Sequence, residues 1–258
     1  MKISFLVPTL GSRENELKRL LNSLENQILK DFEVILVVQD NYDKVLKICD
    51  KYKKMNTNCI YSNKKGLSIN RNLGLKYCNG DIIILSDDDC WYPNYATIEL
   101  ELNFKGCDIL LSQIYDKKNN KFYKKYSQNK YDINHRLELM SKSSIEIAFS
   151  KKIIDSIRFD ESFGLGAQYI CGEEVDFLLN AYINGYKIKY IPKIMVYHAI
   201  KEKNTYKADQ IVAKGALYAK HFNIIYGIFV CIRDLILKRE NNITNFFRGY
   251  YEYIKRNS

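Results

Sequence analysis

The sequence predicts an α/β fold with a mostly parallel central sheet, followed by a helical extension at the C-terminus. Residues 3–7 and 32–38 are continuous apolar runs of strand length, a pattern typical of parallel strands that are buried on both faces. Between them, apolar residues recur at helical spacing, which predicts an amphipathic helix. Because strands and helices keep alternating as far as residue 86, we expect right-handed strand–helix–strand units and a Rossmann-like first half.

Local patterns predict the individual elements of this first half. The first helix places Leu17, Leu20, Leu21, Leu24 and Ile28 on one face, with Ser12 positioned to cap its start. Further along, we expect a helix over 43–54, a strand over 58–62, a helix over 68–78 and a strand over 81–86.

The chain is less regular from residue 107 onward. We expect strands over 107–115 and 143–150, a helix over 173–183, and strands over 187–191 and 194–198. The polar stretch 116–136 is expected to be a long loop or insertion. Since no internal repeat or linker is visible, residues 1–200 are interpreted as one domain with halves at about 1–106 and 107–200. Residues 201–258 form its helical extension.

The composition of the 258-residue chain indicates a globular protein. Hydrophobic residues make up 47%, and there are only 12 Gly and 3 Pro, which excludes disordered and collagen-like classes. Seven Cys without a C-x-x-C pair argue against a disulfide framework or a structural zinc site and fit a reducing cytosol. Residues 1–8 predict a first strand rather than a signal peptide, and the apolar run 224–232 is too short for the ~20 residues of a membrane span.

The formal charge of +10 is concentrated at the C-terminus. Residues 201–258 hold 11 Lys and Arg against 5 Asp and Glu, which accounts for +6 of it. A positive surface attracts nucleic acid, anionic lipid or phosphorylated small molecules. The same segment contains an apolar helix face with basic flanks, which either lies in a membrane interface or packs on the preceding domain. The face comprises Leu217, Tyr218, Phe222, Ile224, Ile225, Ile228, Phe229, Ile232, Leu235 and Ile236, and the flanks are Lys214, Lys220, Lys238 and Arg239.

Three adjacent carboxylates, Asp87, Asp88 and Asp89, follow the buried strand at 81–86. Ligands of α/β sheets bind at the carboxyl ends of the strands. Adjacent carboxylates repel one another, so they need either solvent or a cation to offset their charge. Oxygen-rich sites of this kind suit Mg²⁺ or Mn²⁺ shared with the phosphates of a substrate. The triplet is therefore a candidate metal site, the alternative being a solvated turn that caps the next helix.

Two glutamates, Glu173 and Glu174, occupy the first turn of the later helix. A helix N-terminus stabilises anions, so a carboxylate there stays ionised, as a general base requires. The alternative is the ordinary placement of acids in a first turn. Ser68 and Arg71 begin another helix near the same sheet edge, which is suited to a phosphate group. His198 ends a predicted strand.

Together these pieces resemble a known family. From about residue 2 to residue 200 the chain is similar to the family 2 glycosyltransferases of the GT-A fold, of the type found in bacterial polysaccharide synthesis. The resemblance rests on Val7-Pro8-Thr9, Asp40, the segment 66–74, the segment 81–89 with its Asp-x-Asp motif, the segment 159–166, Gly172-Glu173-Glu174 and Tyr197-His198. In that family, residues 1–106 correspond to the nucleotide-sugar half and 107–200 to the acceptor half.

The resemblance implies roles for individual residues. Pro8, Thr9 and Asp40 match positions that hold the nucleotide base and ribose, Ser68 and Arg71 lie beside the nucleotide, and Asp87 and Asp88 belong to the donor site. Asp89, Asp87 and His198 match the metal site. Glu174 matches the catalytic base of inverting members, with Glu173 its neighbour in the same dyad.

The sequence departs from the family pattern at two places. The dyad is usually Glu-Asp and here is Glu-Glu, so Asp176 competes for the role of base. The segment after the second strand usually reads Asp-Asp-Gly-Ser, and here residues 39–42 read Gln-Asp-Asn-Tyr, which leaves the identity of the nucleotide open.

The implied function is the transfer of a sugar, with inversion, to a saccharide or lipid-linked acceptor. The favoured donor is a UDP-sugar, and the expected cofactor is Mn²⁺ or Mg²⁺. The expected location is cytoplasmic, with peripheral attachment to an anionic membrane surface on its inner face. Two rivals are nucleotidyl transfer to a sugar phosphate and a non-catalytic phosphate- or nucleic-acid-binding module. The second leaves the acidic clusters unexplained because clustered acids repel phosphate backbones, so no nucleic-acid partner is expected.

Overall fold

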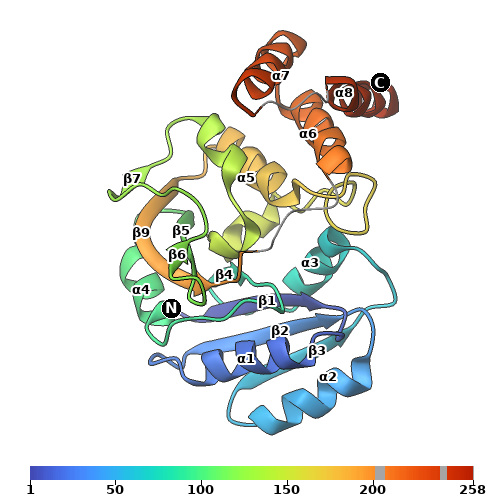
Figure 1. Ribbon diagram of the computed structural model, residues 1–258. Coiled ribbons are helices and arrows are strands. Elements are labelled where there is room, and N and C mark those ends of the chain that lie inside the picture. The colour runs from blue at the N-terminus through green and yellow to red at the C-terminus, as the bar shows by residue number, and fades with distance from the viewer. Residues whose placement is uncertain (201–206, 239–242, 258) are drawn as a thin grey trace.

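The computed structural model describes residues 1–200, 207–238 and 243–257, and one twisted sheet runs through it (Figure 1). The strand order is β3-β2-β1-β4-β8-β5-β9-β7, with β6 paired to β5. The strands are β1 (Ile3–Thr9), β2 (Phe32–Val38), β3 (Asn56–Tyr61), β4 (Ile82–Leu85), β5 (Ile109–Asp116), β6 (Lys121–Phe122), β7 (Tyr131–Asp132), β8 (Ile147–Ser150) and β9 (Ile188–Tyr197). The pairs among β3, β2, β1 and β4 are parallel, as is β5 with β9. The prediction of a mostly parallel sheet is confirmed.

Helices cover both faces of the sheet, which is why its central strands are apolar throughout. Consecutive residues of β1 point into opposite cores: Phe5 and Val7 into one, Leu6 into the other. The first core is closed by α1 (Glu14–Glu25), α2 (Tyr42–Cys49) and α4 (Ala96–Asn103). The second is closed by α3 (Leu67–Leu75), α5 (Glu173–Ile183) and the C-terminal helices.

Several boundaries differ from those that the sequence predicts. The two strands expected at 187–191 and 194–198 form one strand, β9, because irregular pairing with β5 lets it continue past Pro192. The stretch 116–136, expected to be a loop, contains the short strands β6 and β7, each paired with a neighbour. Helix α4 was not predicted, and its weak apolar periodicity explains why.

The predicted start and end of the first helix were wrong. Helix α1 begins after Arg13, and the Ser12 side chain forms no capping hydrogen bond. Its end lies at Glu25, so Ile28, which was expected on the apolar face, lies beyond the helix and is exposed. Leu17, Leu20, Leu21 and Leu24 are buried as predicted, because these four members of the predicted face lie within the helix.

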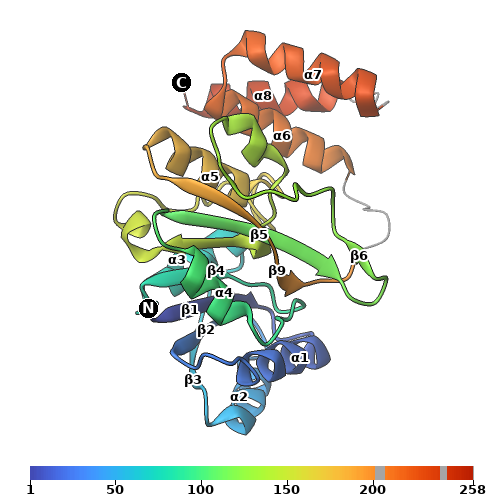
Figure 2. The same cartoon turned by 90° about the vertical axis from the view of Figure 1, so that its left-hand side faces the viewer.

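The C-terminal extension consists of α6 (Lys207–His221), α7 (Ile224–Lys238) and α8 (Ile243–Asn257). Helices α6 and α8 join the core beside α5, while α7 lies at the outer end of the molecule (Figures 1 and 2). Arg239, one of the predicted basic flanks, lies outside the described residues, as do the side chains of Leu235, Ile236 and Lys238. Among the described residues, no helix combines the length and the apolar character that crossing a bilayer demands.

Helices α6 and α8 approach so closely that each presents a glycine to the backbone of the other. A Cβ atom at Gly249 would lie 1.9 Å from the carbonyl oxygen of Val212, and one at Gly215 would lie 2.0 Å from that of Phe246. Both distances are far below van der Waals contact, so a larger residue at either position must push the helices apart.

We therefore expect Gly249→Ala to lower the free energy of unfolding by about 1–3 kcal/mol, the usual cost of overpacking. The matched control is Gly227→Ala in α7, where the new methyl group meets only the Tyr250 ring, at 3.3 Å, and alanine is the better helix former. Urea unfolding followed by circular dichroism measures both. Equal stabilities of the two variants would contradict the close packing.

Candidate functional site

The candidate site lies where β1 and β4 end side by side at the same edge of the sheet. Because these parallel strands are neighbours, Thr9 at the end of β1 meets the carboxylates that follow β4. The hydroxyl of Thr9 donates to Oδ2 of Asp88 at 2.7 Å and accepts from the backbone N–H of Gly11 at 2.9 Å. Burial raises the pKa of Asp88, while the hydrogen bond from Thr9 opposes that rise. Asp88 is thus fixed in place at the base of the site.

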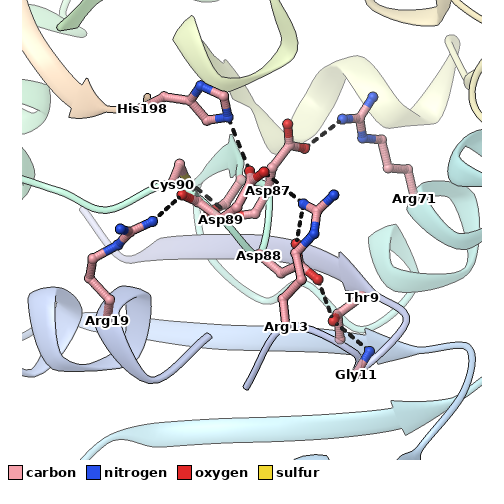
Figure 3. Close-up of polar contacts among 11 residues, drawn as sticks. Thr9, Gly11, Arg13, Arg19, Arg71, Asp87, Asp88, Asp89, Cys90 and His198 are labelled. Carbon is pink, nitrogen blue, oxygen red and sulfur yellow. Dashed lines mark hydrogen bonds and ion pairs between the residues drawn. The ribbon is translucent and has the colours of Figure 1, made fainter. Parts of the chain in front are cut away.

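Two arginines, Arg13 just before α1 and Arg19 within it, offset the negative charge of the triplet (Figure 3). Nη1 of Arg13 lies 3.2 Å from Asp88 and 2.6 Å from Asp89. Arg19 donates to the backbone carbonyl of Asp89 at 2.7 Å, and its guanidinium lies 3.9 Å from the centre of the Trp91 ring. The sequence predicts that the three carboxylates need positive charge nearby, and these two arginines supply part of it.

Arg71 connects the aspartate triplet with the glutamate pair. Its side chain is fully buried, and it pairs with Glu173 at 2.9 Å through one nitrogen and with Asp87 at 3.3 Å through another. Arg71 comes from α3, Asp87 from the turn after β4, and Glu173 from the start of α5. One guanidinium thus joins three segments that are far apart in the sequence.

The first turn of α5 presents three acids with different surroundings. Glu173 is buried against Arg71. Glu174 is partly buried, and burial together with the neighbouring Glu173 carboxylate raises its pKa well above the usual range. This shift is opposite to the ionisation that the helix N-terminus was expected to favour, because burial outweighs the helix dipole. Asp176 is fully buried and pairs with Lys220 at 2.7 Å and His221 at 2.6 Å. Since both of these partners belong to α6, Asp176 is engaged on the side where the C-terminal extension packs.

His198 reaches the triplet from the end of β9. Its Nε2 lies 3.1 Å from Oδ1 of Asp89, and its buried Nδ1 has no hydrogen-bond partner among the described residues. The backbone on either side is held in place: the His198 amide bonds the carbonyl of Tyr115, and the amide of Ile200 donates to Asp116 at 2.8 Å. Asp116 is fully buried, so it acts as an internal anchor for the segment that follows His198.

The predicted metal ligands lie close together only in part. Asp89 and His198 are adjacent, and their carboxylate and imidazole donors fit a divalent cation that takes further ligands from a bound phosphate. Asp87 faces Arg71 instead. Over the described ranges, no three His, Cys, Asp or Glu side chains are grouped so as to hold a metal by themselves.

An open cleft of about 1020 Å³, including the solvent at its mouth, adjoins the triplet. It is lined by Pro8, Thr9, Leu10, Ser12, Arg13, Gln39, Lys65, Gly66, Leu67, Asp87, Asp88, Asp89, Leu165 and Gly166. Asp40 lies beside this lining and pairs with Lys65 at 2.9 Å. Ser68, by contrast, is buried, and its hydroxyl donates to the carbonyl of Phe163 at 2.5 Å. Ser68 therefore fixes the loop that contributes Leu165, rather than facing the cleft.

Sequence patterns did not identify Arg13, Arg19, Lys65 or Asp116 as site residues. Arg13 lies in the loop between β1 and α1. In the structure it pairs with Asp88 and Asp89. The signal that could have found it is its place at the carboxyl end of β1, the same edge at which the triplet lies.

The family described as "Glycosyl transferase family 2" matches residues 4–172. Two bacterial relatives are similar in sequence. A GalNAc(5)-diNAcBac-PP-undecaprenol beta-1,3-glucosyltransferase of Campylobacter jejuni is 27% identical over 173 residues, which cover 63% of this chain and 56% of the relative. The poly(ribitol-phosphate) beta-N-acetylglucosaminyltransferase TarS of Staphylococcus aureus is 26% identical over 226 residues, which cover 84% of this chain and 39% of TarS. The chain thus spans about half or less of the length of these two relatives.

Solved structures share the fold. TarS residues 1–349 in complex with UDP-GlcNAc superpose with a TM-score of 0.73 at 21% identity, covering 99% of this chain and 81% of that one. A mannosyltransferase of Pyrobaculum calidifontis in complex with GDP-Man and Mn²⁺ gives a TM-score of 0.60 at 13% identity, covering 98% and 69%. The predicted GT-A fold is confirmed.

The buried bridge through Arg71 leads to a prediction about stability. We expect Arg71→Met to lower the free energy of unfolding by about 3–5 kcal/mol, because it leaves the buried Glu173 carboxylate without a partner. Adding Glu173→Gln removes that uncompensated charge, so the double variant should recover about 1–3 kcal/mol relative to the sum of the single variants. Urea unfolding of all four proteins gives this coupling energy. A coupling of zero would show that the pair does not interact.

Proposed function

Since the chain belongs to glycosyl transferase family 2, we propose that it transfers a sugar, with inversion, from a nucleotide-diphosphate sugar to a hydroxyl group of its acceptor. The observation that supports this best is the bridge through Arg71, which brings the aspartate triplet and the glutamate dyad to one site. In the proposed reaction the aspartate triplet binds the donor and the glutamate dyad removes the proton from the acceptor, so both groups must lie at one site.

The cleft beside the triplet is the proposed donor site. Two cationic side chains, Arg13 and Lys65, line it and are suited to a diphosphate, while Pro8 and Thr9 form its wall at the end of β1. Gln39, which lines the cleft, and Asp40, which lies beside it, are the proposed contacts of the nucleoside. UDP is the favoured nucleotide; the TarS structure holds UDP-GlcNAc, whereas the Pyrobaculum enzyme holds GDP-Man.

Glu174 is the proposed base. It is partly accessible, its pKa is raised by burial, and Glu173 beside it is engaged by Arg71. A base of raised pKa accepts a proton more readily from a hydroxyl. The deprotonated oxygen would attack the anomeric carbon from the face opposite the nucleotide in a single displacement. Asp176, the rival base, is fully buried between Lys220 and His221, which disfavours it.

Asp89 and His198 are the proposed holders of a divalent cation, Mn²⁺ or Mg²⁺. Asp87, which pairs with Arg71, would join them only by leaving that ion pair. Such a cation, when bound, supplies Lewis-acid stabilisation of charge on a diphosphate leaving group. Arg13 already contacts Asp89, so the chain provides positive charge at the same place.

The proposed acceptor is a saccharide or a lipid-linked saccharide in cell-surface polysaccharide synthesis. The support comes from the names of two relatives, one acting on an undecaprenol-linked saccharide and the other on poly(ribitol-phosphate). Because nucleotide sugars are cytoplasmic compounds, we propose that the reaction takes place on the cytoplasmic side, with the protein attached peripherally to the membrane.

Nucleotide binding tests the donor site. In calorimetry with UDP, GDP, CDP and TDP, with and without Mn²⁺, we expect one diphosphate to bind tightly, and we expect that affinity to fall at least ~10-fold, or about 1.4 kcal/mol, without the metal or in Asp89→Ala. The matched control is Asp155→Ala, which removes an exposed carboxylate elsewhere and should bind as wild type. If no diphosphate binds to the folded protein, the donor site is wrongly placed.

The pH dependence of transfer tests the base. Glu174 must be ionised to accept a proton, so the rate should fall as the pH drops through its raised pKa, at a pH above the ~4.3 of an ordinary glutamate. Replacing Glu173 by Gln removes the neighbouring negative charge and lowers the pKa of Glu174. The fall in rate should therefore begin at a lower pH than in the wild type. Glu174→Gln should reduce kcat by about 10²–10⁴-fold.

The control for this series is Glu161→Gln, an exposed carboxylate on a nearby loop whose partner is Asn72. We expect its pH profile to match that of wild type. A severe loss in Glu173→Gln, combined with an active Glu174→Gln, would assign the role of base to Glu173 instead.

A further inference from the structure

One face of helix α7 exposes a continuous stripe of large apolar side chains. The stripe consists of Ile224, Ile225, Ile228, Phe229 and Ile232, with exposed fractions between 39% and 67%. These positions are spaced i, i+1, i+4, i+5 and i+8, so they share one side of the helix. Isolated apolar residues are common on protein surfaces, but a whole helix face of them marks an interaction site.

The stripe is not the face by which α7 packs on the protein. That packing uses Gly227, which lies against the Tyr250 ring of α8, and Tyr226, whose ring stacks on Phe222 at 5.0 Å. The sequence left open whether the whole apolar face from 217 to 236 covers the catalytic domain. The structure divides it: Leu217, Tyr218 and Phe222 are buried, whereas the five residues of the stripe are exposed.

Positive charge accompanies the exposed stripe. Arg233 on α7 and Arg248 and Lys255 on α8 are exposed, whereas Asp209 and Glu252 are the exposed acids among the described residues of the extension. Glu252 pairs with Arg248 at 3.7 Å. Helix α8 adds the exposed apolar side chains of Ile243, Tyr251 and Ile254. Apolar side chains flanked by basic ones are the combination by which interfacial helices bind anionic lipid surfaces.

We propose that α7 lies in the surface of an anionic bilayer, with its apolar stripe among the acyl chains and the nearby basic side chains at the phosphate headgroups. The orientation is in the plane of the membrane, because a helix of 15 residues spans ~22 Å and the hydrocarbon core is ~30 Å thick. In both views α7 is the outermost element, beyond α6 and α8, so a flat surface can reach it without meeting the sheet (Figures 1 and 2).

The lipid-facing helices are connected to the wall of the cleft. On α8, Tyr253 lies 6.3 Å from Phe163 and 6.2 Å from Tyr169, ring centre to ring centre, and Arg256 bonds the side chain of Gln168. The loop 163–169 also supplies Leu165 to the cleft lining. The proposal that α7 binds a membrane does not depend on the proposed function. Only the idea that membrane binding brings a lipid-linked acceptor to the site rests on that function.

Co-sedimentation with vesicles tests the proposal. We expect the full chain to bind vesicles of mixed phosphatidylcholine and phosphatidylglycerol, to bind pure phosphatidylcholine vesicles more weakly, and to lose affinity as salt is added. The double variant Ile225→Glu and Phe229→Glu should bind the mixed vesicles at least ~10-fold more weakly, since it places two charges in the stripe. The matched control is Leu102→Glu, at a position on α4 that is 67% exposed like Phe229, and it should bind as wild type.

Other results overturn the proposal. It fails if the wild type binds no vesicles or if the double variant binds them as well as wild type does. It also fails if light scattering shows a dimer that the double variant abolishes while vesicle binding is absent, because the stripe would then cover a second copy. Calorimetry with the nucleotide that binds the wild type, repeated on the double variant, keeps this test separate from the donor site. Unchanged affinity there shows that only the membrane surface was altered.

Discussion

The buried guanidinium of Arg71 is the interaction on which the arrangement of the site depends. It pairs with Asp87 after β4 and with Glu173 at the start of α5, and it has no exposed surface. A buried cation is tolerated only when anions compensate it, so these three segments are held to one relative placement. The aspartate triplet and the glutamate pair are thus held next to one another by a single side chain.

The aspartate triplet illustrates how a concentration of negative charge is kept in a folded protein. Thr9 fixes Asp88 by a hydrogen bond, Arg13 spans Asp88 and Asp89, and His198 approaches Asp89 from β9. With Arg71 beside Asp87, each of the three carboxylates therefore has a cationic or hydrogen-bonding partner within the chain.

The C-terminal extension has two separate relations to the rest of the molecule. Helix α6 engages α5, because Lys220 and His221 pair with Asp176 only two residues beyond Glu174, the proposed base. Helix α7 instead turns its apolar side outward. The same segment thus contacts the first turn of α5 on one side and exposes the apolar stripe of α7 on the other.

The sequence by itself determined the features that depend on neighbouring residues. The apolar runs of β1, β2 and β4, the start of α5 at Glu173 and the placement of three carboxylates at a strand end all follow from local periodicity. Only the tertiary structure decided that Glu173 and Asp176 are engaged in buried ion pairs, that Ser68 faces inward, and that Arg71 pairs with residues 16 and 102 positions away. The physical reason is that a side chain's partner and burial depend on how distant elements pack, and no local pattern records that packing.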